Sequence, residues 1–261
     1  MERLPLSVVL IAHNEIHNIR RCLESVQCWV EEIILLVNDC TDGTDLVAQK
    51  EFGAKVFTSQ WEGYGNQKNR AQTYASQPWI LSLDADETVT VELKKAIEKF
   101  LENPASHAGA QFPRCTRYLG RWIRHGDWYP DRSLRLFRRS KGRWVGGLVH
   151  EKLVVEGKIA TLRGDLRHYS YPNLATGLSK IHHFAELFVR KKHELATQPS
   201  LFKIAIAAPG HATWTFLRGY FLRQGFRDRF AGLCVAVHSA FATYFKYVLW
   251  YESNRPRDGE P

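Results

Sequence analysis

Up to residue 101, the chain alternates between apolar runs and segments whose apolar side chains recur at helical spacing. After the first run, Ile16, Ile19, Leu23 and Val26 follow the helical period, and we expect Asn14 to cap that helix. The predicted strands are Leu6–Ala12, Glu32–Val37, Ala54–Thr58 and Trp79–Asp84. Such alternation is typical of an α/β fold, in which helices flank a mostly parallel sheet.

Polar residues follow three of these predicted strands at the point where each strand ends. They are His13-Asn14-Glu15, Asn38-Asp39 and Asp84-Ala85-Asp86-Glu87. The carboxyl ends of parallel strands meet at one edge of the sheet, and ligands bind in the crevice beyond that edge. The three clusters therefore predict one shared ligand site.

Asp84 and Asp86 form an Asp-x-Asp pair after an apolar strand. Carboxylate oxygens are the ligands that Mg²⁺ and Mn²⁺ prefer, and Mg²⁺ keeps positions open for substrate phosphates. A bound cation would stabilise the charge that gathers on a nucleoside diphosphate leaving group. The alternative is a surface turn whose acids favour the start of the next helix.

The charge distribution and the cysteine content limit which binding partners and which cellular compartment suit the protein. The net charge is +9, but residues 1–113 are acidic and residues 114–261 are basic. An acidic front part suits a metal, and a basic rear part suits an anionic lipid, a phosphorylated glycolipid or nucleic acid. The five cysteines form no C-x-x-C pair, which favours free thiols in a reducing cytoplasm.

The rear part of the chain differs in pattern. Residues 111–155 alternate aromatic and arginine-rich segments with turns, which predicts antiparallel strands, and the chain reads as helical from about residue 173. Residues 230–250 are apolar, but the uncharged stretch 230–245 is short for a membrane span of about 20 residues. We expect a helix lying in the membrane interface, and domains at 1–172 and 173–261.

Several motifs together resemble glycosyltransferase family 2, whose members are inverting enzymes of the GT-A fold. They are Ser7–Glu15, Thr41-Asp42-Gly43-Thr44 and Leu83-Asp84-Ala85-Asp86-Glu87. Trp61–Asn69, Trp128–Arg139 and Val149-His150-Glu151 are similar to the branch that includes bacterial lipopolysaccharide core β-1,4-glucosyltransferases. The resemblance extends over nearly the whole chain, and the motifs occur in the family's order.

The resemblance implies roles for single residues. Ala12, His13 and Glu15 would hold the nucleoside, and Lys68 would lie near the nucleotide. Asp84 would contact the ribose or the metal, and Asp86 the metal. One departure concerns the acidic residue that the family carries directly after the second strand. That position is Val37 here, so Asn38 or Asp39 would have to substitute for it in recognising the base.

Inversion needs one general base, which takes the proton of the acceptor hydroxyl as its oxygen attacks the anomeric carbon. Glu151 is the first candidate, because the wider family carries a catalytic acid after the arginine-rich strand. Asp131 is the second, and its alternative role is a structural salt bridge to Arg132 or Arg135. His150 would serve the acceptor or orient Glu151.

Two rival functions fit parts of the pattern. Asp84, Asp86 and Thr88 match the D-x-D-x-T motif of haloacid-dehalogenase-type phosphatases, but there the motif follows the first strand and not the fourth. A non-catalytic membrane or nucleic-acid binding module would leave the acidic clusters unexplained.

The resemblance implies hexose transfer, from UDP-glucose, to an inner-core sugar of lipopolysaccharide such as heptose. Mg²⁺ or Mn²⁺ would be the cofactor, and the acceptor a glycolipid. We expect a cytoplasmic enzyme, peripheral on the inner membrane, without a nucleic-acid partner. The alternative is another cell-surface polysaccharide or glycolipid pathway.

Overall fold

The computed structural model describes residues 3–146, 151–195, 198 and 200–255. The chain divides into two compact units, each with its own core. Unit 1 comprises Met1–Arg114 and Asp131–His168, and unit 2 comprises Cys115–Pro130 and Tyr169–Pro261. Residues 115–130 thus pack with the C-terminal helices, whereas the functional division at residue 172 stays a prediction.

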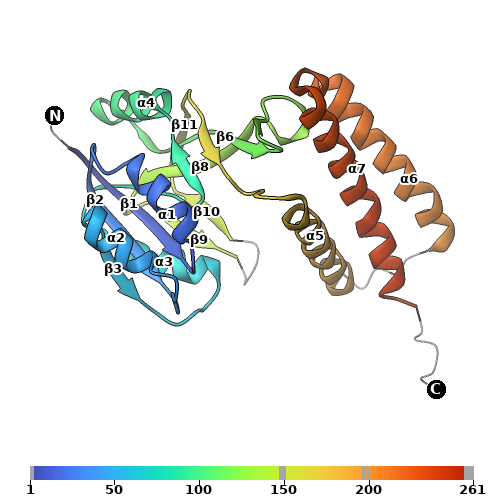
Figure 1. Cartoon of the computed structure of the whole chain (residues 1–261), viewed down its shortest axis with the longest axis horizontal. Helices are drawn as coiled ribbons and strands as arrows, with labels where there is room; N and C mark the ends of the chain where they lie inside the picture. The colour runs from blue at the N-terminus through green and yellow to red at the C-terminus, as the bar shows by residue number, and fades with distance from the viewer. Residues whose placement is uncertain (1–2, 147–150, 196–197, 199, 256–261) are drawn as a thin grey trace. The chain divides into compact units, whose positions relative to one another are not determined.

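Unit 1 is built on a mixed sheet in the order β3-β2-β1-β4-β8-β6-β12-β5, with β11 also paired to β6 (Figure 1). Strands β1 to β4 run parallel, and β8 then runs antiparallel to β4 and β6. A separate antiparallel pair joins β9 and β10. The strands are β1 (Leu4–Ala12), β2 (Val30–Val37), β3 (Lys55–Thr58), β4 (Trp79–Ser82), β5 (Glu87–Val89), β6 (His107–Tyr118), β8 (Asp131–Arg138), β9 (Gly142–Val145), β10 (Lys152–Val155), β11 (Lys158–Thr161) and β12 (Leu166–His168).

Helices bury both faces of this sheet, which explains why the first strands are apolar throughout rather than alternating. On β1, Val8 and Leu10 join one core with α1, α2 and α4, whereas Val9 joins a second core with α3, Trp144 and Leu153. The helices are α1 (Ile16–Glu24), α2 (Thr44–Phe52), α3 (Tyr64–Thr73) and α4 (Val91–Glu102). The predicted α/β class is confirmed.

The predicted cap of the first helix was wrong. Helix α1 begins after Glu15, while Asn14 has a left-handed backbone with φ of 54°. The Asn14 Oδ1 atom instead accepts a hydrogen bond of 2.9 Å from the backbone N–H of Thr41. Asparagine tolerates this conformation well, and its side chain joins the loops that follow β1 and β2.

Unit 2 packs residues 115–130 with a set of long helices. Its elements are β7 (Arg121–Trp122), η1 (Gly126–Trp128), α5 (Leu174–Glu194), α6 (Leu201–Leu217), η2 (Arg218–Leu222), η3 (Gly225–Asp228) and α7 (Arg229–Glu252). Aromatic side chains dominate one of its cores, where the Trp128 and Tyr171 rings stack at 4.8 Å and Tyr118 meets both edge-on. The buried Asp228 carboxylate accepts backbone hydrogen bonds of 2.8 Å from Arg124 and His125.

Candidate active site

Asp84 follows β4 and lies between two cations of unit 1. Lys68 Nζ is 3.0 Å from its Oδ1 atom, and Arg135 Nη2 is 2.5 Å from its Oδ2 atom. Burial alone would raise the pKa of this carboxyl, but Arg135 and Lys68 outweigh it and hold the pKa well below its usual range. Asp84 is therefore a fixed carboxylate at any physiological pH.

Arg135 is buried on β8 and extends this cluster to further acids. Its Nη2 atom lies 2.8 Å from Oε1 of Glu87, which is fully buried. Arg114 lies 3.5 Å from the same Glu87 oxygen and donates two hydrogen bonds, of 2.9 and 2.6 Å, to Asp131. Asp131 thus forms a structural salt bridge, but with Arg114 rather than with the predicted Arg132 or Arg135.

Lys68 connects Asp84 to Glu151, the first candidate for the general base. Its ammonium group lies 3.4 Å from Glu151 Oε1 and 4.4 Å from the centre of the Trp144 ring. The Lys68 side chain is only 7% exposed, whereas Glu151 keeps 20% of its side chain exposed. One buried cation therefore holds both carboxylates, and Glu151 keeps access to solvent. His150, its predicted companion, lies outside the described residues.

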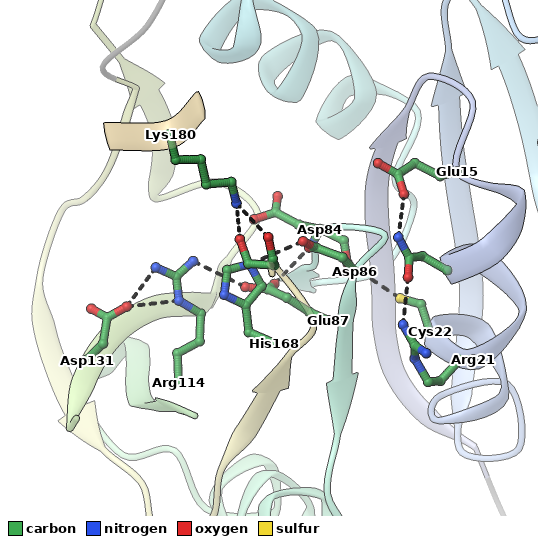
Figure 2. A network of polar contacts seen from close by, with 12 residues as sticks. Glu15, Arg21, Cys22, Asp84, Asp86, Glu87, Arg114, Asp131, His168 and Lys180 are labelled. Atoms are coloured by element: carbon green, nitrogen blue, oxygen red, sulfur yellow. Dashed lines mark hydrogen bonds and ion pairs between the residues drawn. The ribbon is translucent and has the colours of Figure 1, made fainter. Parts of the chain in front are cut away.

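Asp86 lies beside His168, the last residue of β12 (Figure 2). The Asp86 Oδ2 atom is 3.3 Å from His168 Nε2, and both side chains are mostly buried. The pairing follows from the sheet, because β12 runs antiparallel to β5 and places His168 opposite Glu87.

The chemistry of these donors fits a divalent cation at Asp86. In Asp84 both carboxylate oxygens already form ion pairs with cations, whereas Asp86 faces a histidine, itself a common metal ligand. Across the described residues, no group of three or more His, Cys, Asp or Glu side chains is placed to hold a metal. Mg²⁺ is usually held by one or two carboxylates plus substrate phosphates and water, and this smaller set is compatible with that mode of binding.

The loops after β1 and β2 carry the residues expected to hold the nucleoside. Ala12 is buried and pairs with Val37, and His13 Nδ1 donates to the Asn38 carbonyl at 2.7 Å. Asp39 is exposed, with φ of 44°. At the end of β2, Val37 is thus buried in the sheet, and Asp39 is the exposed acid that follows it.

Two other acids near these loops differ sharply in environment. Asp42 accepts hydrogen bonds from the Ile16 and Thr44 N–H groups and the Thr44 hydroxyl, and these outweigh burial and lower its pKa. Burial raises the pKa of Glu15, as do the charges of Asp86, Asp42 and Asp84, and together they outweigh the hydrogen bond of 2.8 Å that Asn18 donates to its carboxylate. Asp42 therefore fixes the loops, and Glu15 belongs electrostatically to the cluster of acids around Asp86.

The sequence did not identify several members of this site. Arg135 was considered as a salt-bridge partner of Asp131, and its ion pairs with Asp84 and Glu87 were not predicted, although an arginine buried on a strand requires an acidic partner. Glu87 was part of the quoted acidic cluster without a role of its own. His168 gave no local signal, because only the pairing of β12 with β5 brings it to Asp86.

Comparisons with known proteins identify the family of the chain. The sequence model described as "Glycosyl transferase family 2" matches residues 7–154. The chain belongs to this family of glycosyltransferases, and its fold is of the GT-A type. Family membership rejects the phosphatase and the non-catalytic binding module as functions of this chain.

Curated relatives match along almost the whole chain. The chain is 28% identical to the lipopolysaccharide core biosynthesis glycosyltransferase LpsC of Rhizobium meliloti (strain 1021), over 95% of this chain and 94% of that protein. It is also 28% identical to the uncharacterized glycosyltransferase RP128 of Rickettsia prowazekii (strain Madrid E), over 92% and 85%.

Among solved structures, S. aureus TarS 1–349 in complex with UDP-GlcNAc is similar with a TM-score of 0.48 and 14% identity, over 96% of this chain and 91% of that one. Glucosyl-3-phosphoglycerate synthase from Mycobacterium tuberculosis, in complex with Mg²⁺ and UDP, gives a TM-score of 0.47 at 18% identity, over 71% and 78%.

Proposed function

We propose that this glycosyltransferase moves a hexose, glucose from UDP-glucose, to an inner-core sugar of lipopolysaccharide such as heptose, with inversion at the anomeric carbon. The observation that carries the proposal is the cluster in which Lys68 joins Asp84 to Glu151. The similarity to LpsC along nearly the full length of both chains supports the class of acceptor.

In the proposed reaction, Glu151 accepts the proton of the acceptor hydroxyl as its oxygen attacks the anomeric carbon. The bond from that carbon to the diphosphate oxygen breaks in the same displacement. Lys68 and Arg135 hold Asp84 as a rigid hydrogen-bond acceptor for the donor's ribose. His13, Glu15 and Asp39, with the backbone of Ala12, surround the nucleoside. Asp131 ranks second as base, because Arg114 holds its carboxylate in a salt bridge.

Asp86, with His168 beside it, would hold Mg²⁺ or Mn²⁺ together with the donor's phosphates. A cation held by these residues would supply positive charge that offsets the negative charge of the departing diphosphate. Asp84 contributes to this site through its fixed negative charge.

We further propose that the enzyme is cytoplasmic and that residues 173–261 attach it to the inner face of the cytoplasmic membrane, where a glycolipid acceptor resides. Within the described residues, the helical segment Gly225–Glu252 is long and apolar enough to span a membrane by length and composition, and only 17% of its most apolar part is buried. The exposed apolar side chains within residues 214–230, which join α6 to α7, support contact with lipid.

A donor screen tests the proposed function. Purified protein with Mn²⁺ or Mg²⁺ receives UDP-, GDP- and dTDP-sugars, and nucleotide release is measured with and without heptose-terminated inner-core acceptor. We expect UDP release from UDP-glucose that rises with the acceptor. Release from no donor would overturn the transferase assignment, and release from another donor would overturn only the choice of UDP-glucose.

A further inference from the structure

The connection between α6 and α7 carries large apolar side chains that extend into solvent. We call residues 214–230 the hairpin tip, because α6 and α7 pack along each other and this segment joins them (Figure 1). Between 48% and 71% of each of these residues is exposed: Trp214, Phe221, Leu222, Phe226 and Phe230. Exposed apolar side chains that cluster on one short segment indicate a surface that contacts a membrane or another molecule.

The interior of the hairpin tip has no room for these side chains. Gly219, Gly225 and Gly232 bring backbone against backbone, so that a Cβ atom on Gly225 would lie 2.8 Å from the Gly219 carbonyl oxygen. A Cβ atom on Gly232 would overlap the Gly225 carbonyl oxygen. The aromatic side chains therefore cannot turn inward to bury their apolar surface.

The arginines of the hairpin tip fall into two classes. Arg218 and Arg223 pair with the Asp127 carboxylate at 2.9 and 3.0 Å and hold the tip to residues 126–128. Arg227 and Arg229 are exposed. Arg227 hydrogen bonds to the neutral Gln224, and in the described part of the chain neither residue has an acidic partner.

Acidic residues do not offset this charge. Asp228 is the one acid within residues 214–230. Its buried carboxylate accepts hydrogen bonds from the backbone N–H groups of Arg124 and His125 and from the His125 ring. The exposed surface of the tip is thus apolar and positively charged, a combination that matches the interface of an anionic bilayer.

We propose that the hairpin tip is the element by which this protein docks on an anionic lipid bilayer. The aromatic side chains and Leu222 enter the headgroup region, and Arg227 and Arg229 contact lipid phosphates. This inference rests on the proposed membrane association and names the surface responsible. A second copy of the chain fits less well, because two identical tips would bring unpaired arginines of like charge together.

Sedimentation of the full chain with vesicles tests the proposal. The vesicles contain phosphatidylglycerol and phosphatidylethanolamine, and phosphatidylcholine vesicles serve for comparison. We expect the double variant Phe226→Ser/Phe230→Ser to bind at least about tenfold more weakly, because each exposed ring loses its burial in lipid. The matched control, Phe184→Ser/Phe202→Ser, removes two rings outside the tip that are at least as exposed, and it should bind like the wild type.

A second pair of variants tests the charges. Arg227→Gln/Arg229→Gln should weaken binding to anionic vesicles roughly tenfold or more at low salt, since each basic residue near such a surface contributes appreciably. The control Arg190→Gln/Lys191→Gln removes two exposed charges of α5 and should have little effect. Nucleotide release by all variants should equal that of the wild type, since none of these residues lies in the active site.

Three results would overturn the proposal. If the wild type does not sediment with vesicles but releases nucleotide from the donor, the proposed membrane association is wrong and the proposed transferase function stands. If the Phe184 and Phe202 variants weaken binding as much as the tip variants, the helices dock along their sides. If tip variants bind lipid normally but lower the mass measured by sedimentation equilibrium, a second copy covers the tip.

Discussion

The active-site cluster of unit 1 and the hairpin tip of unit 2 differ in whether their charged side chains have partners of opposite charge. Around Asp84, the carboxylates of Asp84, Glu87 and Glu151 each have a cation within 3.5 Å, and Arg135 and Lys68, each 7% exposed, both bind two carboxylates. In the hairpin tip, Arg227 and Arg229 lie exposed beside side chains such as Phe230, which is 71% exposed. Internal partners fix the first region before any ligand arrives, whereas the second lacks the partners that would complete it.

Four predictions test this contrast. The largest effect should come from Asp86→Ala, which removes the carboxylate proposed to hold the cation. Turnover should fall by about 10³-fold or more, because the leaving diphosphate loses its charge stabilisation. Nucleotide release under saturating Mn²⁺ measures the effect. Glu24→Ala, which removes an exposed acid at the end of α1, is the control and should keep full activity. Unchanged turnover in Asp86→Ala would remove the proposed metal role.

Arg135→Met should destabilise the fold strongly. Glu87 is fully buried, and loss of its close cation would leave an uncompensated charge, at a cost of about 3–5 kcal/mol. Urea unfolding followed by circular dichroism gives the change in the free energy of unfolding. The exposed neighbour Arg132→Met should change it little. Equal effects of the two variants would contradict the claim that this cluster is fixed by internal pairing.

Glu32 predicts a pH dependence of stability in unit 1. Burial alone would raise its pKa, but Lys55, Ser7 and Ser76 outweigh this and lower the pKa to about 2 from an ordinary 4.5. The resulting stabilisation, on the order of 3 kcal/mol, is complete above pH 4.5 and is lost as the pH falls through 2. Thermal unfolding between pH 7 and pH 2 should show a shallower decline for Glu32→Gln, and parallel declines would contradict the prediction.

The smallest effect on folding should come from the hairpin tip. Phe230→Ser should change the free energy of unfolding by less than about 0.5 kcal/mol, because most of the ring is already in water. Phe137→Ala, in the core of unit 1, should cost about 3–5 kcal/mol. A large loss in Phe230→Ser would mean that the tip serves the fold rather than an external partner.

The sequence predicted β1 to β4 of unit 1 in order because both faces of these parallel strands are buried. Runs such as Leu6–Ala12 are then apolar throughout, and the polar clusters that follow them identify one edge of the sheet. The motif at Asp84 and Asp86 could be found in this way because a chain segment of three residues carries both carboxylates.

Pairings between distant strands were beyond prediction. Arg135 reaches Asp84 only because β8 pairs with β4, and His168 reaches Asp86 only because β12 pairs with β5. The prediction that Asn14 caps the first helix was wrong for a related reason, because the Asn14 side chain accepts a hydrogen bond from Thr41 in the neighbouring loop. Likewise, the division of residues 115–130 from their neighbours in sequence depends on contacts such as Asp127 with Arg218.

The proposed catalytic centre is the cluster joined by Lys68, with Glu151 as the base. One assay tests it directly: transfer of glucose from UDP-glucose to an inner-core heptose acceptor by Glu151→Gln and by Asp131→Asn, with donor binding measured in parallel. We expect Glu151→Gln to lose about 10²–10⁴-fold in kcat with donor binding retained, whereas Asp131→Asn should keep most of its turnover. The reverse pattern, with Asp131→Asn inactive and Glu151→Gln active, would contradict it.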